Sequence, residues 1–309
     1  MSNLYDIIII GAGPAGMTAG VYTARKKLKT LIISKDIGGQ ASWSSDIENY
    51  LGFSMITGPD LVKKFEDHLE EFKEDLELRI SISGIKDIKK KGKNFEVMTG
   101  DGKTETAKAV IIAGGKVPRM LGVPGEKEFL NRGVAYCAYC DGPLFKGKDV
   151  AIIGGGNSAL DSALNVSKIV KQIYIINITK ELDGDKVMID KVMDLPHIRV
   201  MNNTEAVVIE GEKTVSSIRI KSRDGGLQKD LPVSGVFIEV GSLPATDYLK
   251  GLVKLNKHSE IVIDEYNMTS VAGIFAAGDI TTVIEKQIIT AAGEGAKAAI
   301  QASQYLAKI

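Results

Sequence analysis

The chain has 309 residues, of which 44% are hydrophobic and 25% charged, and its 39 basic and 39 acidic side chains leave no net charge. This length suits two domains of ordinary size, and with balanced charge no basic face or tail indicates binding to nucleic acid or a membrane surface. No apolar run approaches the roughly 18 residues of a membrane span, and no basic segment followed by a long apolar stretch marks a secretory leader, so we expect a cytoplasmic protein.

The first predicted unit is a strand, a glycine-rich turn and a helix. The apolar strand Asp6 to Ile10 runs directly into the turn, Gly11-Ala12-Gly13-Pro14-Ala15-Gly16. Gly11 permits a tight turn, Gly13 lets backbone amides approach a pyrophosphate, and Gly16 allows close packing of helix and strand. The helix N-terminus then faces the anion, so we expect a dinucleotide here.

A helix from Ala15 to Lys26 and a second strand from Thr30 to Ser34 complete this unit. In NAD-binding units an acidic residue about 20 residues after the glycines binds a ribose hydroxyl. Here the strand is expected to end at Ser34, and Asp36 follows two residues later. This departure weakens a simple NAD interpretation and leaves the ribose partner open.

A second unit of the same kind is expected in the middle of the chain. The strand Val150 to Ile153 runs into Gly154-Gly155-Gly156-Asn157-Ser158-Ala159, which fits G-x-G-x-x-A. A helix from Ser158 to Ser167 and a strand from Gln172 to Asn177 follow. Repetition of one supersecondary unit indicates two nucleotide-type domains.

Further elements are expected on either side of the second unit. One strand spans Ala107 to Ala113, before Gly114-Gly115, and another runs from Gly273 into Gly278-Asp279. An Ala-rich helix follows, from about Glu285 to Ala307.

Two segments broken by Gly and Pro, Lys116 to Pro124 and Val240 to Ala245, are predicted to be linkers. We therefore expect residues 1–115 and 245–309 to form one discontinuous domain and residues 116–244 to form a second. The predicted fold is α/β, with two Rossmann-like, three-layer (ββα/βαβ) nucleotide-binding domains, the second inserted in the first.

The only two cysteines, Cys137 and Cys140, form a C-x-x-C pair with Asp141 next. Such a pair can close a disulfide within one helical turn, and it commonly carries a thiolate of lowered pKa. A structural zinc site would need about two more Cys or His ligands, and the three histidines lie far away in sequence, so we expect no metal. A dithiol between two nucleotide folds indicates electron transfer between a cofactor and a disulfide.

Together these motifs resemble the low-molecular-weight thioredoxin reductase family over nearly the whole chain. The match rests on the two glycine loops, Gly38-Gly39-Gln40, Ile111 to Gly115, Cys137 to Asp141, Gly278-Asp279 and Lys286-Gln287. The resemblance implies that the discontinuous domain binds FAD, that the inserted domain is NAD(P)H-binding-like and carries the dithiol, and that the protein is a homodimer that reduces thioredoxin.

The resemblance also implies a set of FAD-binding positions: Gly11, Gly13, Pro14, Ala15, Gly16, Ser34, Gly39, Gln40, Asn49, Ala113, Gly114, Gly278, Asp279, Lys286, Gln287 and Ile288. Asp279 would take a flavin-side hydroxyl, and Gln287 would lie near the isoalloxazine. Trp43 and Tyr50 would either flank the flavin or pack in the core.

The family also assigns roles around the dithiol. Cys140 would be the sulfur nearest the flavin, and Cys137 would attack the disulfide of the partner protein. Asp141 would give or take the proton of the departing thiolate, since a nearby carboxyl can do acid–base work. The alternative role for Asp141 is that of a turn residue before Gly142-Pro143.

One stretch departs from the pattern of NADPH-using members, in which the strand after the second glycine loop ends in His-Arg-Arg, with another Arg a few residues later. Here Asn177, Ile178 and Thr179 occupy the first three positions, and Asp183 falls at about the position of the last Arg. Lys180 is the only cation in the stretch. Without the arginines, NADPH is a doubtful cofactor. NADH would need an acidic residue where Asn177 stands, so the site does not fit NADH well either.

Some clostridial-type members that lack these arginines take electrons from reduced ferredoxin, and this chain resembles that ferredoxin-dependent flavin thioredoxin reductase group. We therefore expect electrons to pass from reduced ferredoxin through FAD to Cys137–Cys140 and then to thioredoxin. Three alternatives stay open: an NAD(P)H-dependent reductase with divergent contacts, an O2-dependent dithiol oxidase, and a non-catalytic redox sensor. Lys89-Lys90-Lys91 with Lys93 is either a docking patch for an acidic ferredoxin or a solvated turn.

Overall fold

A computed structural model describes residues 4–44, 47–226 and 228–309. The chain forms two compact units, one made of residues 1–117 and 243–309 and the other of residues 118–242. Both divisions fall inside the predicted linkers. Each unit is an α/β structure around its own parallel sheet, which confirms the predicted fold class with the second unit inserted in the first.

The sheet of the first unit has the strand order β3-β2-β1-β6-β5-β4, and β17 pairs with β6. Strands β1, β2, β3, β6 and β17 run parallel, whereas β4 and β5 form an antiparallel hairpin beside β6. The strands are β1 (Leu4–Ala12), β2 (Thr30–Ile37), β3 (Leu76–Ile80), β4 (Ile85–Lys91), β5 (Asn94–Thr99), β6 (Thr104–Ile112) and β17 (Ile274–Ala276).

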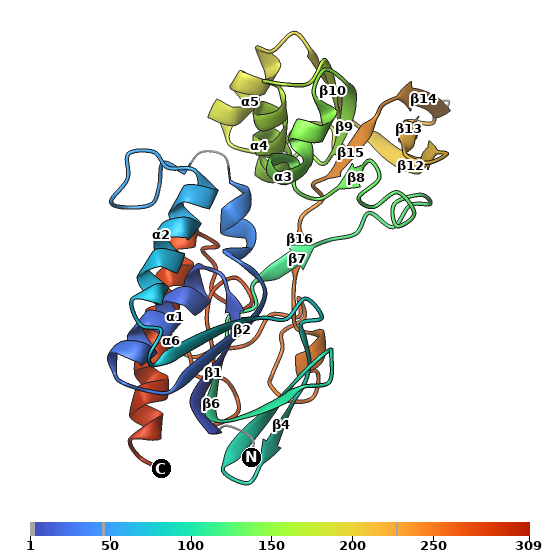
Figure 1. Cartoon of the computed structure of the whole chain (residues 1–309). Helices are drawn as coiled ribbons and strands as arrows, with labels where there is room; N and C mark the ends of the chain where they lie inside the picture. Colours follow the sequence, from blue (N-terminus) through green and yellow to red (C-terminus); the bar gives the residue numbers. More distant parts are fainter. Residues whose placement is uncertain (1–3, 45–46, 227) are drawn as a thin grey trace. The chain divides into compact units, whose positions relative to one another are not determined.

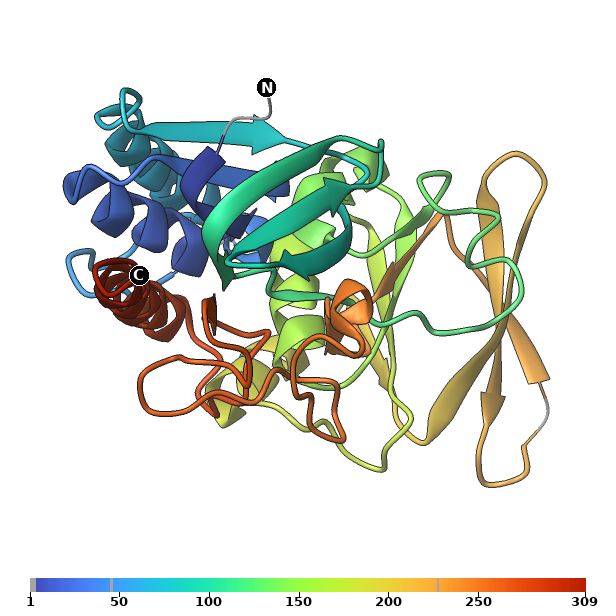
Figure 2. The ribbon, with the colours of Figure 1, turned by 90° about the horizontal axis from the view of Figure 1, so that it is seen from below.

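Alternation along β1 builds the two cores of this unit. Ile7 and Ile9 pack on the face covered by helices α1 (Pro14–Arg25) and α6 (Ile288–Leu306). Because successive side chains of a strand point to opposite faces, Ile8 and Ile10 belong to the other core, with residues of β5 and of the segment 249–280. Helices α1 and α6 lie side by side against the sheet (Figures 1 and 2).

Among the boundaries that differ from the prediction, two bear on the site. Strand β2 continues to Ile37 because Ile37 still pairs with Ala12, so Asp36 lies inside the strand rather than beyond it. Helix α6 begins at Ile288 and not at Glu285. Gln287 keeps an extended backbone as the N-cap, and the Lys286 ammonium donates to the backbone oxygen of Thr281 (2.6 Å), which holds the preceding turn.

Short segments complete the first unit. Helix α2 (Gly58–Glu70) is capped by Thr57, whose side chain accepts from the Asp60 N–H. Two single-turn helices are η1 (Gly39–Trp43) and η3 (Asp247–Leu249). The two linkers form a two-stranded sheet, in which β7 (Lys116–Pro118) pairs with β16 (Ser242–Pro244).

The second unit has a parallel sheet in the order β11-β10-β9-β15-β8 and a separate antiparallel sheet, β12-β13-β14. Helix α4 covers one face of the parallel sheet, and the antiparallel sheet covers the other. The bounds are β8 (Val134–Ala135), α3 (Ala138–Asp141), η2 (Gly142–Phe145), β9 (Asp149–Ile153), α4 (Asn157–Val166), β10 (Gln172–Ile176), α5 (Lys186–Met193), β11 (Ile198–Met201), β12 (Thr204–Gly211), β13 (Val215–Ser222), β14 (Gln228–Pro232) and β15 (Gly235–Ile238).

Candidate active site

The first glycine loop joins β1 to α1 at the carboxyl edge of the sheet. Gly11 has φ +105°, and a Cβ there would lie 2.3 Å from the backbone oxygen of Ala113. A Cβ on Gly16 would lie 1.8 Å from the backbone oxygen of Gly11. Only glycine therefore fits either position, and the absence of side chains brings α1 against the strand.

The N-terminus of α1 lies at the first glycine loop. Gly13 is its N-cap, without a side-chain cap, and no acidic residue stands in the first turn. The nearest heavy atom to a Cβ built on Gly13 is the backbone oxygen of Gly38, at 3.9 Å, so the space beside the loop is open. Unpaired N–H groups at such an end favour a phosphate. The loop therefore fits the pyrophosphate of a dinucleotide.

The end of β2 forms one wall of this cradle. Ser34 Oγ accepts a hydrogen bond from the Ala12 N–H at 3.0 Å, so this predicted cofactor residue also ties the two strands together. Asp36 Oδ1 accepts from the Gly39 N–H at 3.2 Å. A Cβ on Gly39 would lie 3.8 Å from the Gly13 Cα. The structure thus places the Ser34 side chain and the Gly39 backbone beside the first glycine loop.

The turn after β17 meets the same cradle. Gly278 has φ +77°, and a Cβ there would lie 3.1 Å from the Ala15 Cβ at the start of α1. The neighbouring Asp279 is partly buried, and burial raises the pKa of its carboxyl while Lys286 and Lys116 offset part of that rise. A carboxyl at this edge can bind a sugar or ribityl hydroxyl.

Two lysines surround Glu260 close to Asp279. Lys286 Nζ donates to the backbone oxygen of Asp279 at 3.2 Å and pairs with Glu260 at 3.4 Å. Lys116 Nζ lies 3.7 Å from the same Glu260 oxygen, and its backbone oxygen accepts from Gln40 Nε2 at 3.3 Å. Predicted site residues from three separate segments therefore meet here.

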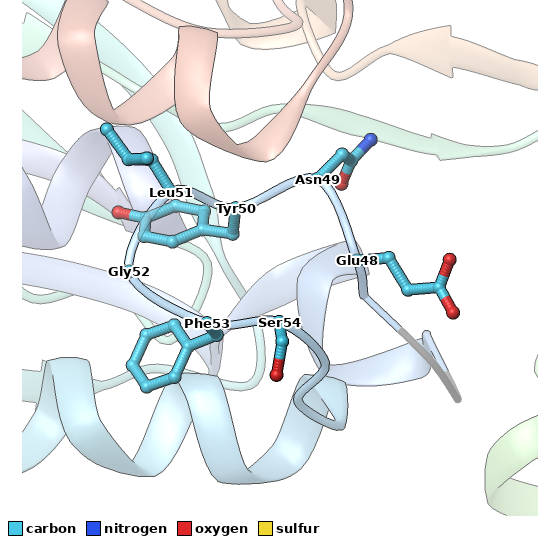
Figure 3. A pocket seen from close by; sticks show the side chains of 7 residues that line it. All are labelled: Glu48, Asn49, Tyr50, Leu51, Gly52, Phe53 and Ser54. Atoms are coloured by element: carbon cyan, nitrogen blue, oxygen red, sulfur yellow. The ribbon is translucent and has the colours of Figure 1, made fainter.

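The loop Glu48–Ser54 lines a surface cavity of about 470 Å³ (Figure 3). Asn49 Nδ2 donates to Gln287 Oε1 at 3.1 Å, which joins two residues that the sequence placed in one site. The Tyr50 ring packs on Phe65 with centroids 5.7 Å apart, in the cluster formed with Ile47. Tyr50 therefore has a packing role.

The dithiol lies at the start of α3 in the second unit. Cys137 and Cys140 form a disulfide with Cα atoms 5.3 Å apart, and Cys137 Sγ accepts from the Cys140 N–H at 3.0 Å. Cys137 is 9% exposed, whereas Cys140 is exposed. Asp141 follows at once, and partial burial raises the pKa of its carboxyl, which favours a group that holds a proton at higher pH than usual.

A buried carboxylate, that of Glu126, connects the dithiol strand to the first linker, and no sequence pattern pointed to it. Glu126 is 1% exposed and accepts hydrogen bonds from the N–H groups of Leu121 (2.7 Å) and Gly122 (2.6 Å). The Tyr136 hydroxyl donates to the same carboxylate at 2.6 Å. Because Tyr136 precedes Cys137, this network fixes the strand that leads to the disulfide.

The second glycine loop is covered by the chain's own segment 177–185. The Asp183 N–H donates to the Gly155 backbone oxygen at 2.8 Å, and the Asp185 N–H donates to Asn157 Oδ1 at 2.7 Å. Asn177 is 2% exposed, and its Nδ2 donates to backbone oxygens within the segment. The segment is thus tied to the loop at its C-terminal end and braced internally by Asn177.

Acidic groups gather at this loop. A Cβ on Gly154 would lie 2.2 Å from the backbone oxygen of Glu239, and the Glu239 carboxylate accepts from the hydroxyls of Ser158 and Ser162. Burial raises the pKa of Glu239, the two serine bonds offset part of the rise, and the charge of Asp161 adds to it. This environment is less favourable to a phosphate than that of the first loop.

The structure also brings in a cation that sequence reasoning missed. Arg223 follows β13, and its Nη1 donates to the backbone oxygen of Ile178 at 3.2 Å. The guanidinium therefore lies beside the first of the two positions where NADPH-using members would carry paired arginines. Arg223 lies 45 residues from Ile178 in the sequence, so no local pattern predicts this contact.

Comparison with known proteins identifies the family. The model of the pyridine nucleotide-disulphide oxidoreductases matches residues 5–295. The chain belongs to the pyridine nucleotide-disulphide oxidoreductase family. A protein named NADH dehydrogenase from Bacillus subtilis is 39% identical over 98% of this chain and 58% of its own length. The chain thus spans just under three fifths of the length of the curated relatives it matches.

Solved structures of thioredoxin reductases resemble this member of the family. That of Lactococcus lactis is 34% identical, covers 99% of this chain and 100% of its own, and has a TM-score of 0.91. A ferredoxin-flavin thioredoxin reductase from Clostridium acetobutylicum is 29% identical over 99% of each chain, with a TM-score of 0.53. Within the described ranges, no helix is long and apolar enough to cross a membrane, and no cluster of acidic, His and Cys side chains would hold a metal ion.

Proposed function

We propose that this chain is an FAD-dependent disulfide reductase that passes electrons from reduced ferredoxin to thioredoxin through Cys137–Cys140. The first glycine loop and Asp279 fit FAD, because the loop has an open anion site and Asp279 supplies a carboxyl for hydroxyls. Bound FAD would collect single electrons and deliver them as a pair. We also propose, by resemblance to the family, a cytoplasmic homodimer.

The chemistry at the dithiol belongs to the chain's own residues. Two electrons and one proton convert the Cys137–Cys140 disulfide to one thiol and one thiolate, and Asp141 supplies the proton. The Cys137 thiolate then attacks the thioredoxin disulfide, forming a mixed disulfide and releasing one thioredoxin thiolate. Asp141 then takes the Cys140 proton, and the Cys140 thiolate attacks Cys137 Sγ, which re-forms the internal disulfide and releases the second thioredoxin thiolate. The two thioredoxin thiolates take two protons from solvent, and Asp141 is left protonated for the next cycle.

The observation that carries the choice of donor is the segment 177–185 over the second glycine loop. Ile178, Thr179 and Asp183 stand where cations would bind a 2′-phosphate. A hydrogen bond to a charged group contributes ~1.5–3 kcal/mol, so losing two or three weakens NADPH binding by roughly 10³-fold or more. The partly buried carboxylate of Glu239 and the acidic groups of Asp183 and Asp185 add repulsion.

The energetics favour a ferredoxin donor. The reduction potential of a low-potential iron–sulfur protein is about −400 mV, and that of thioredoxin is about −270 mV. The difference is roughly 130 mV. For a pair of electrons this is ~6 kcal/mol downhill. The similarity to the Clostridium acetobutylicum ferredoxin-flavin thioredoxin reductase supports the same donor.

A pyridine-nucleotide donor is the second candidate, because Arg223 contacts the Ile178 backbone oxygen and a relative carries the name NADH dehydrogenase. The two candidates separate under anaerobic conditions. Purified yellow protein is mixed with NADPH, with NADH and with reduced ferredoxin, and bleaching of the flavin band is followed in each case. Fast bleaching by ferredoxin alone supports the proposal. Fast bleaching by a nicotinamide nucleotide that is lost in Arg223→Met overturns it in favour of the second candidate.

A further inference from the structure

Tyr248 carries a buried hydroxyl without a partner. It lies in η3, and its ring packs with the apolar cluster on the sheet face opposite α1 and α6. Within the described residues, the Tyr248 hydroxyl oxygen is buried and accepts or donates no hydrogen bond. Burial raises the pKa of this phenol, so the hydroxyl keeps its proton. An unmet buried donor costs roughly 1–3 kcal/mol.

Other tyrosines of the chain show what a buried hydroxyl normally has. Tyr5 donates to Glu77 at 2.8 Å, and Tyr136 donates to Glu126 at 2.6 Å. Phenylalanine would fill the apolar cluster around Tyr248 without leaving a polar atom unpaired. The hydroxyl of Tyr248 therefore requires a hydrogen-bond partner that the described part of the chain does not supply.

The hydroxyl lies at the cofactor cradle. A Cβ on Gly114 would be 3.3 Å from it and 3.4 Å from the Ile280 Cδ1. Gly114 follows Ala113, whose N–H donates to the backbone oxygen of Ile10 (2.8 Å) just before the first glycine loop. Ile280 follows Asp279. The hydroxyl thus lies near the carboxyl ends of β6 and β17, the edge at which ligands bind in such sheets.

We propose that Tyr248 is a cofactor-binding residue whose hydroxyl donates a hydrogen bond to an oxygen of the bound flavin dinucleotide. This inference rests on the proposed function, because it needs FAD in the first unit. Gly114 takes part by having no side chain, which leaves the hydroxyl access to the cofactor. The unpaired donor is then satisfied only when the cofactor is bound.

The test is Tyr248→Phe in the full chain, with Tyr266→Phe as the control, since Tyr266 is 50% exposed and lies outside the cradle. Apoprotein is titrated with FAD, and binding is followed by quenching of flavin fluorescence. Loss of one hydrogen bond of ~1–1.5 kcal/mol predicts about 5- to 10-fold weaker FAD binding. The apoprotein of Tyr248→Phe is expected to melt at a higher temperature than wild type, because an unmet donor is gone.

These two effects have opposite signs, which a purely packing role would not produce. FAD affinity equal to wild type, or an apoprotein that melts lower, overturns the inference and assigns the hydroxyl to a water molecule or to packing. Gly114→Ala supplies a second measurement: it should weaken FAD binding in wild type and add little in Tyr248→Phe, because both changes act on one contact. A wild-type chain that binds no FAD overturns the proposed function itself, which is a different result.

Discussion

The backbone N–H of Asp183 donates to the carbonyl oxygen of Gly155 at 2.8 Å. This bond fixes an acidic segment against the loop that would cradle a nicotinamide nucleotide. The same segment carries Ile178, which is 51% exposed, where a cation would bind a 2′-phosphate. The proposed choice of electron donor therefore depends on a few side chains whose backbone is already held in place.

Replacing those side chains should restore NADPH binding. In Ile178→Arg/Asp183→Arg, two cations are added and one carboxylate is removed, so each new bond to phosphate contributes ~1.5–3 kcal/mol. NADPH affinity, measured by calorimetry, is expected to rise at least about 100-fold. Asp190→Arg, on exposed α5, is the matched control. An equal gain in the control, or no gain in the double variant, contradicts the account of this loop.

The order of the two sulfurs is open to trapping. Cys140→Ser leaves Cys137 free to form a mixed disulfide that cannot be resolved, so a stable adduct with thioredoxin is expected on non-reducing gels and by mass spectrometry. Cys137→Ser should give little adduct. The reverse pattern would exchange the two roles, in keeping with the greater exposure of Cys140.

Asp141 should matter for proton transfer rather than for folding. Asp141→Asn removes the acid, and general acid–base groups contribute about 10²–10⁴-fold. The rate of thioredoxin reduction is expected to fall at least about 100-fold, with unfolding unchanged in urea. Asp194→Asn, at the exposed end of α5, is the control. If Asp141 were only a turn residue, Asp141→Asn would lower the free energy of unfolding and leave the rate of thioredoxin reduction nearly normal.

Glu239 makes stability depend on pH. Its pKa is raised in the folded chain, so the native state binds the proton more tightly than the unfolded state. The contribution of Glu239 to the free energy of unfolding is therefore fully present below the pKa of the carboxyl in the unfolded chain. It is lost as the pH rises through the pKa of the carboxyl in the folded chain. The urea midpoint of Glu239→Gln, relative to that of wild type, should therefore be higher at pH 8 than at pH 5. A difference that is the same at both pH values would show that the carboxyl is not perturbed.

The Glu126 network should stabilise the second unit. Tyr136→Phe removes one hydrogen bond to a buried carboxylate, and bonds to charged groups contribute ~1.5–3 kcal/mol. Urea unfolding should register a loss of about that size. Tyr174→Phe, in β10, serves as the comparison, and equal losses in both variants would remove the special role of Tyr136.

The sequence predicted those parts of the site that depend on local pattern. The glycine positions follow from steric need, since Gly11 and Gly16 face backbone atoms within 2.3 Å of a Cβ. Family resemblance gave Asn49 and Gln287 as FAD-binding positions, and the structure joins them by a hydrogen bond that the sequence did not predict. The start of α6 was misplaced because an Ala-rich pattern does not show that Gln287 stays extended.

What the sequence did not predict depends on distant partners. Arg223 reaches Ile178 through the turn after β13, and Glu126 gains its role only when Tyr136 folds beside it. The unpaired hydroxyl of Tyr248 has no sequence signature, because it is defined by what surrounds it. Such features depend on tertiary packing, which residue spacing does not encode.

The most direct test of the account is a single-turnover measurement under anaerobic conditions. Protein holding FAD is mixed with oxidised thioredoxin and a known amount of reduced ferredoxin, and free thiols are counted. The account predicts about two ferredoxins oxidised for each thioredoxin disulfide reduced, with no thiols formed when NADPH replaces ferredoxin. Rapid formation of thiols with NADPH, and none with ferredoxin, would contradict it.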